Sequence, residues 1–174
     1  LNYNNKNERP KYNKQLLQQL CTPGIITQDK ANMITILDNW KRKQSTEKPV
    51  MIFINVSGGG LRSATFVMNT LQQLDSITKG SLMKQTFLIS GASGGMLSAT
   101  YFRELYSRKL SDSTVNLHNA AYTENITKDL LSPVFSSMIS RDIFSPAQKF
   151  SIGPYRDVKD RGFAFEEKLS DNTG

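Results

Sequence analysis

A continuous stretch from Pro49 to Tyr101 constrains the fold of this chain more than any other part of its sequence. Within it, an apolar run from Val50 to Val56 ends in Ser57-Gly58-Gly59-Gly60, and a second run from Thr86 to Ser90 ends in Gly91-Ala92-Ser93-Gly94-Gly95. Each run predicts a β-strand, and each glycine-rich turn predicts a sharp entry into a helix. Their short separation predicts a right-handed βαβ unit with parallel strands. The unbroken first run also predicts a strand that is buried on both faces.

Helical periodicity predicts the elements around these strands. The predicted helices run over Lys14–Leu20, Gln28–Lys43 with Thr27 as N-cap, Ser63–Ile77 and Gly94–Lys109, with a last helix opened by Asp160 as N-cap. The inner faces predicted for the two central helices are Phe66, Val67, Thr70, Leu71 and Leu74, and Leu97, Tyr101, Leu105 and Tyr106. Between them and the last helix we expect helical spacing interrupted at Ser132-Pro133 and an irregular aromatic segment from Phe144 to Tyr155. We therefore expect a polar lead-in and helical segment over residues 1–48 and an α/β domain over residues 49–174.

The composition indicates a globular domain and argues against several classes of function. The chain has 174 residues, of which 38% are hydrophobic, enough for one sizeable core. Its net charge of +7 comes from scattered Lys and Arg residues without a recognition motif, so we expect no nucleic-acid partner. A single cysteine and a single histidine favour neither an internal disulfide nor a zinc site, and we expect no metal or cofactor. No apolar stretch reaches the length of a membrane-spanning helix.

Ser93 is the candidate nucleophile. It is the serine of a Gly-x-Ser-x-Gly pattern, in which small neighbours allow a strained strand-to-helix turn that presents the hydroxyl outward. The helix that follows would point its N-terminal dipole at negative charge developing near this hydroxyl. The same residues also fit a tight glycine turn that only packs a helix on a sheet.

Gly58, Gly59 and Gly60 are the candidate oxyanion loop, joined by Gly94 of the second turn. Consecutive glycines remove the side chains and let backbone N–H groups approach an oxyanion. One such donor is worth about 3 kcal/mol in acyl transfer. Arg62 follows in the first turn of a helix, where the dipole disfavours a cation, so we interpret it as a substrate-binding residue for a phosphate or a carboxylate. The alternative is an exposed arginine without a role.

Together, and in this order, the two turns resemble the patatin-like phospholipases and related lipid acyl hydrolases. That family has a Gly-Gly-Gly-x-Arg loop after its first core strand and a Gly-x-Ser-x-Gly turn after the next. The resemblance extends over about Pro49 to Tyr106 and implies a three-layer α/β/α fold with a mainly parallel sheet. It implies a lipid or phospholipid ester substrate, a nucleophile at Ser93, no metal, and peripheral contact with a membrane. Ser57 departs from the family, in which many members have Asp at this position.

The aspartate of the Ser-Asp dyad that the resemblance implies has no counterpart in this sequence. In the family it stands in an Asp-Gly-Gly or Asp-Gly-Ala motif downstream, and no aspartate here is followed by glycine. Asp160 fits a helix N-cap better, and His118 fits an ordinary surface histidine better than a base. We therefore expect a truncated domain whose dyad aspartate lies outside this chain.

Two other functions fit parts of the pattern. A nucleotide- or phosphate-binding domain also places a glycine-rich loop between a strand and a helix. Against it, Ser63 occupies the position of the third glycine of a dinucleotide fingerprint, and the chain has no Gly-Lys-Ser/Thr of a P-loop. An inert fragment or pseudoenzyme that keeps the fold as a binding module would explain the missing aspartate.

Overall fold

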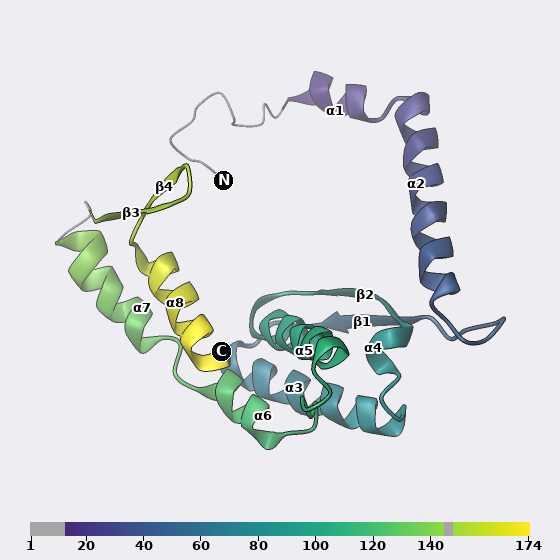
Figure 1. Ribbon diagram of the computed structural model, residues 1–174. Coiled ribbons are helices and arrows are strands. Elements are labelled where there is room, and N and C mark those ends of the chain that lie inside the picture. Colours follow the sequence, from purple (N-terminus) through teal and green to yellow (C-terminus); the bar gives the residue numbers. More distant parts are fainter. Residues whose placement is uncertain (1–12, 145–147) are drawn as a thin grey trace. The chain divides into compact units, whose positions relative to one another are not determined.

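The structure, a computed structural model, describes residues 13–144 and 148–174 (Figure 1). Its chain forms two compact units, which we treat separately. One unit comprises residues 1–49 and 149–157, and the other comprises residues 50–148 and 158–174. The second unit contains both glycine-rich turns. Residues 149–157, although distant in sequence, group with the first unit.

The centre of the second unit is a pair of parallel strands. Strand β1 (Ile52–Val56) pairs with β2 (Thr86–Gly91), with Ile54 opposite Ile89 and Val56 opposite Gly91. Helix α3 (Gly60–Ile77) and the short helix α4 (Leu82–Gln85) connect them. A mixed α/β fold with parallel strands is thus confirmed. Because parallel strands end at the same edge of a sheet, both glycine-rich turns emerge side by side.

The prediction that the first strand is buried on both faces is wrong. Along β1, Ile52, Ile54 and Val56 pack against the core, whereas Phe53 is 61% exposed. On β2, Leu88 is 50% exposed. The side chains on both faces of β1 are mostly apolar, but the core covers only one face. Burial therefore alternates along β1 with the two-residue period of a strand. Strand β1 also begins two residues later than Val50.

The core forms where α3 packs on α5 (Ser93–Ser111), which also contacts both strands. Its most deeply buried large side chains include Met68 of α3 and Phe102 of α5, with Leu117 and Ile126 packed against them. The predicted inner face of α5 is confirmed, with Tyr101 and Leu105 buried and Leu97 and Tyr106 half-buried against the core.

The predicted inner face of α3 is only partly right. Phe66 is 71% exposed and Leu74 is 39% exposed, while Val67 and Leu71 are buried. The buried residues of this helix are Ala64, Val67, Met68, Leu71, Gln72 and Asp75. This is regular helical spacing, but two of its positions are polar. A prediction based on hydrophobic residues alone therefore placed Phe66 and Leu74 on the buried face of α3 and missed Gln72 and Asp75.

Three helical segments complete the second unit. They are α6 (Ala120–Thr127), α7 (Ser132–Ser137), which continues into the π-helix η2 (Met138–Ile143), and α8 (Arg161–Thr173). Pro133 does not interrupt a helix as predicted, because it lies in the first turn of α7, where its missing N–H has no intrahelical partner to lose. Asp160 is confirmed as the N-cap of α8, and its Oδ1 accepts a hydrogen bond from the N–H of Phe163 at 3.0 Å.

The first unit contains two helices and a pair of strands. Helix α1 (Lys14–Leu20) is confirmed, but α2 (Pro23–Arg42) begins five residues before the predicted start. Thr22 is its N-cap and Pro23 occupies the first turn, so Thr27 lies inside the helix and its hydroxyl donates to the Pro23 carbonyl. Strands β3 (Lys149–Ile152) and β4 (Tyr155–Val158) pair with each other where an irregular segment was predicted. Of the predicted lead-in and helical segment over residues 1–48, residues 1–12 lie outside the described residues.

Candidate functional site

Ser93 is the first residue of α5, and only Ala92 separates it from the end of β2. Its φ is +52°, in the left-handed region that L-residues other than glycine seldom adopt. A non-glycine residue in this conformation costs about 1–3 kcal/mol and persists only where the surrounding structure imposes it. The sharp strand-to-helix turn therefore places a strained serine at the carboxyl edge of the sheet.

The glycine loop after β1 touches this serine. A side chain at Gly58 would place its Cβ 3.1 Å from the Cβ of Ser93. Gly59 and Gly60 have φ values of +151° and +58°, so the path of the loop requires glycine at both positions. The hydroxyl of Ser63, one turn into α3, donates to the Ser57 carbonyl at 2.6 Å and ties the start of the loop to the helix.

Gly94 and Gly95 allow the two turns to pack directly on each other. A Cβ at Gly94 would overlap the carbonyl of Gly60, and a Cβ at Gly95 would overlap the carbonyl of Ser57. Any larger residue at either position would force the glycine loop away from Ser93. The structure thus brings together Ser93 and the four glycines predicted to form its oxyanion hole.

Two helix N-termini converge here, because α3 begins at Gly60 and α5 begins at Ser93. The first N–H groups of a helix lack intrahelical acceptors, and the helix dipole adds partial positive charge at that end. Neither helix has an acidic residue in its first turn to neutralise this charge. The arrangement therefore suits an oxyanion beside Ser93.

Ser93 also faces a cavity of about 450 Å³. Gly60, Ser93 and Gly94 contribute to its lining, and the remaining lining side chains are all apolar: Leu61, Met96, Leu97, Leu130, Leu131 and Phe165. A largely apolar cavity with a few polar groups at one place is typical of a small-molecule site. Of its apolar lining, sequence reasoning named only Leu97, and that as a core residue. Phe144, which begins the predicted aromatic segment, is 78% exposed and lines no part of this cavity.

Arg62 does not share this cavity. It lines a separate open hollow of about 630 Å³ along α3, together with Phe66, Asn69 and Gln73. Arg62 therefore lies in the first turn of α3, next to the glycine loop, but it does not share a binding site with Ser93.

No histidine or carboxylate lines the Ser93 cavity among the residues that the structure describes. Asp75 is fully buried, and Nε2 of His118 lies 3.5 Å from its Oδ2, but this pair sits about four helical turns, roughly 20 Å, along α3 from Gly60. The described residues also contain no cluster of His, Cys, Asp and Glu that could hold a metal ion. A general base for Ser93 is therefore absent from the described part of this site.

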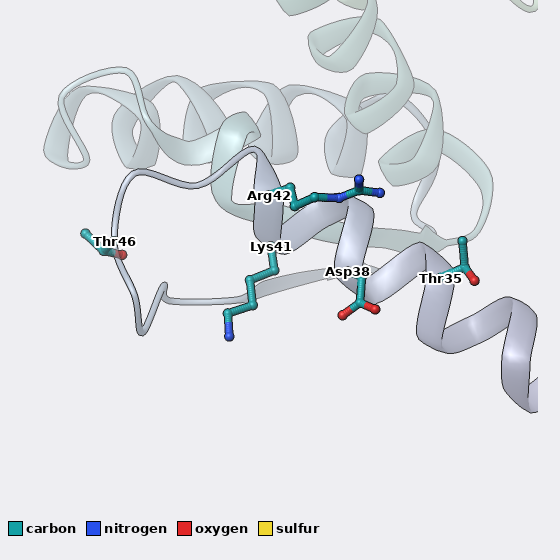
Figure 2. A pocket seen from close by; sticks show the side chains of 5 residues that line it. All are labelled: Thr35, Asp38, Lys41, Arg42 and Thr46. Carbon is teal, nitrogen blue, oxygen red and sulfur yellow. The ribbon is translucent and has the colours of Figure 1, made fainter.

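The first unit has a hollow of its own, of about 600 Å³, lined by Thr35, Asp38, Lys41, Arg42 and Thr46 (Figure 2). All five residues are exposed, and their side chains point in different directions. The guanidinium of Arg42 donates to the side chain of Asn39. The hollow has the properties of an ordinary polar surface, and we assign no function to it.

Comparisons of this chain with protein-family models, with curated proteins and with solved structures found no match. Within the described ranges, no helix combines the length and the apolar character needed to cross a membrane. The class of site therefore rests on its geometry: a serine on a strained turn, a glycine loop in contact with it, two helix N-termini and an apolar cavity.

Proposed function

We propose that this chain is part of a carboxylic ester hydrolase of the patatin-like, lipid acyl hydrolase type, with Ser93 as its nucleophile. The observation that carries the proposal is the left-handed conformation of Ser93 at the start of α5, in contact with the Gly58–Gly60 loop and open to an apolar cavity. Acyl transfer through a serine requires a presented hydroxyl, backbone donors for the oxyanion and an apolar space for the acyl group, and this site has a counterpart for each.

In the proposed reaction, the Ser93 oxygen attacks the ester carbonyl carbon. A new C–O bond forms, the carbonyl electron pair moves to its oxygen, and the backbone N–H groups at Gly58–Gly60 and Gly94 stabilise that oxyanion. Collapse breaks the bond to the alcohol, which leaves with the proton from the Ser93 hydroxyl. Water then attacks the acyl-Ser93 ester, releasing the carboxylic acid and restoring the hydroxyl. No metal or cofactor takes part in this scheme.

The finer parts of the proposal follow from the resemblance. They are a three-layer α/β/α domain with a mainly parallel sheet, a dyad aspartate outside this chain, and a lipid or phospholipid ester as substrate, met at a membrane surface. The absence of a carboxylate from the described lining of the cavity supports the second of these.

A phosphate-binding module is the second candidate function. It is favoured by the two helix N-termini that meet beside a glycine loop, since this arrangement binds anions without any general base. An inert domain that keeps the fold for binding would share this property. Both alternatives differ from the hydrolase in one respect: neither needs an activated serine.

Labelling of the full-length protein with a fluorophosphonate probe, read by peptide mass spectrometry, tests for that serine. In this reaction the Ser93 oxygen forms a bond to phosphorus and fluoride leaves. We expect the label on the peptide that contains Ser93, its loss in Ser93→Ala, and its retention in Ser90→Ala. Ser90 is a matched control because its exposed hydroxyl donates to the Asn55 side chain at 3.2 Å and it does not line the Ser93 cavity. An unlabelled but folded protein would overturn the hydrolase proposal and leave the two binding alternatives.

A further inference from the structure

Helix α7 and the π-helix η2 that continues it present a row of apolar side chains to solvent. We call this row the apolar ridge, and its members, all between 41% and 78% exposed, are Leu131, Phe135, Met138, Ile139, Ile143 and Phe144. Leu131, Phe135, Ile139 and Ile143 follow one another at intervals of four residues, which places them along one side of a helix. The ridge is therefore one continuous surface and not a set of scattered exposed residues.

The side of this segment that faces the protein is mostly polar. Ser137 is 3% exposed, and Val134, Arg141 and Asp142 are half-buried. This side faces α8, which packs on α7 and η2 (Figure 1), and Oδ2 of Asp142 lies 3.8 Å from Nε of Arg161 on that helix. The Ser137 hydroxyl and Nη1 of Arg141 are buried without a hydrogen-bond partner among the described residues.

This distribution reverses the usual polarity of a surface helix. Such a helix turns its apolar stripe to the core and its polar residues to water. Here a serine and an arginine are turned inward at a cost in unpaired polar atoms, while two phenylalanines and two isoleucines are turned outward. The reversal indicates that the environment of the ridge is apolar when the protein functions.

We propose that the apolar ridge docks the protein on a lipid surface and guides a lipid ester from that surface to Ser93. The ridge begins at the Ser93 cavity, because Leu131 belongs to the ridge and also lines the cavity. A lipid surface held against the ridge would thus meet the entrance of the cavity. This continuity favours lipid over a protein partner, which would cover the entrance. The inference rests on the function proposed above and names the surface that serves it.

The charges of the segment favour a neutral lipid surface. No member of the ridge is charged, and over residues 132–144 the only charged residues are Arg141 and Asp142, which cancel. A helix that selects anionic lipid carries several Lys or Arg residues on its polar face instead. We therefore expect docking by burial of apolar side chains in zwitterionic lipid, independent of the net charge of the chain.

The test measures binding of the full-length protein to phosphatidylcholine vesicles by flotation, at low and at high salt. We expect binding that high salt does not weaken, because salt screens charges and not apolar burial. Phe135→Ser and Ile139→Ser should each weaken binding by about tenfold, because each removes a large apolar side chain from the buried area. A requirement for anionic lipid, with loss of binding at high salt, would indicate adsorption through the net charge of +7 and overturn the proposal.

Phe66→Ser is the matched control, since Phe66 is 71% exposed on α3 of the same unit but lies outside the ridge. It should leave vesicle binding unchanged. The ridge variants should keep the melting temperature of the unchanged protein, because their replaced side chains are exposed. A melting temperature that falls strongly in Phe135→Ser and Ile139→Ser, but not in Phe66→Ser, would show that protein covers the ridge in the full-length molecule and would also overturn the proposal.

Labelling of Ser93 with a water-soluble fluorophosphonate separates this inference from the hydrolase. The ridge variants should be labelled as fast as the unchanged protein, but should hydrolyse a lipid ester in vesicles about tenfold more slowly. If Ser93 is labelled and the ridge variants bind vesicles as well as the unchanged protein, the ridge is wrong and the hydrolase stands. If Ser93 is not labelled, the hydrolase fails, and vesicle binding alone decides whether the ridge docks on lipid.

Discussion

The conformation of Ser93 is the residue-scale feature that most separates this site from ordinary helix starts. Among the described residues, Lys79 is the other non-glycine with positive φ. It precedes Gly80 just after α3, where left-handed residues commonly terminate a helix. Ser93 begins a helix instead, and nothing in helix initiation requires a left-handed residue there. The strain at Ser93 therefore belongs to the turn that presents its hydroxyl.

Replacing Ser93 by glycine should stabilise the protein. Glycine adopts positive φ without the cost of about 1–2 kcal/mol that an L-residue bears, and this gain exceeds the entropy that glycine loses on folding. We expect Ser93→Gly to have a free energy of unfolding about 0.5–1 kcal/mol above that of Ser93→Ala, measured by urea denaturation. The alanine variant is the reference because it removes the hydroxyl and keeps the strain. Equal stabilities would show that the turn imposes no strain.

Asp75 and His118 form the other unusual pair at this scale. Asp75 is fully buried, and neither carboxylate oxygen accepts a hydrogen bond from the described residues, while His118 lies 3.5 Å away with its side chain 41% exposed. Removing His118 leaves the buried carboxylate without its partner, so His118→Ala should lower the free energy of unfolding by about 1–3 kcal/mol.

A double-mutant cycle isolates that interaction. In an Asp75→Val background the carboxylate is gone, and His118→Ala should then cost little in chemical denaturation. The same loss in both backgrounds would mean that His118 stabilises the protein through other contacts.

At the scale of the elements, α3 shows why its inner face could not be predicted from hydrophobicity. Gln72 is buried because its Nε2 donates to the carbonyls of Leu117 at 2.9 Å and Asn119 at 3.1 Å, which belong to the loop before α6. A polar residue at a core position is stable when it has such partners. Those partners lie more than 40 positions away in sequence, so no local pattern reveals them.

The connection between α6 and α7 should respond to acid through Asp129. The Ser132 hydroxyl, with the N–H groups of Ser132 and Leu131, holds the pKa of Asp129 below its ordinary value of 3.8. A lowered pKa in the folded protein means that Asp129 contributes stability above the unfolded pKa, and that this contribution is lost as the pH falls through the folded pKa.

The measurement is the melting temperature of the unchanged protein and of Asp129→Ala as a function of pH. The unchanged protein should melt higher at neutral pH, and the difference should shrink below the ordinary pKa of 3.8. Asp129→Asn is the control, since it keeps an acceptor but does not titrate. A difference that is independent of pH would contradict a role for the ionised carboxylate.

For the whole molecule, the sequence predicted the central βαβ unit because its strands and turns are encoded within one short stretch. Both strands follow from the apolar runs. The glycines located the two helix starts only approximately, since Ser63 and Gly94 were predicted and the helices begin at Gly60 and Ser93. The strands' outer face was misjudged because Phe53 is as apolar as its buried neighbours, and apolar character does not say which face the core covers. Residues 149–157 were misjudged because Gly153 and Pro154 were interpreted as part of an irregular segment, whereas they form the turn between the paired strands β3 and β4.

The candidate site was predictable only where local motifs form it. Ser93 and its glycines are neighbours within two short segments, so the motifs located them. Leu130, Leu131 and Phe165 reach the same cavity from residues far along the chain, and their placement depends on how α6, α7 and α8 pack. Leu130-Leu131 after Asp129 was a weak signal, since an apolar pair in a connection between helices usually has something to pack against.

The contact between the Gly60 carbonyl and Gly94 also limits how this domain can be changed, by evolution or by design. Since a side chain at Gly94 would overlap the Gly60 carbonyl and one at Gly95 would overlap the Ser57 carbonyl, the loop after β1 and the turn after β2 form one packed module. If either segment alone were grafted into another scaffold, its backbone would lose the matching backbone against which it packs. A successful transplant has to carry residues 57–63 and 91–95 together, with the strand pairing that aligns them.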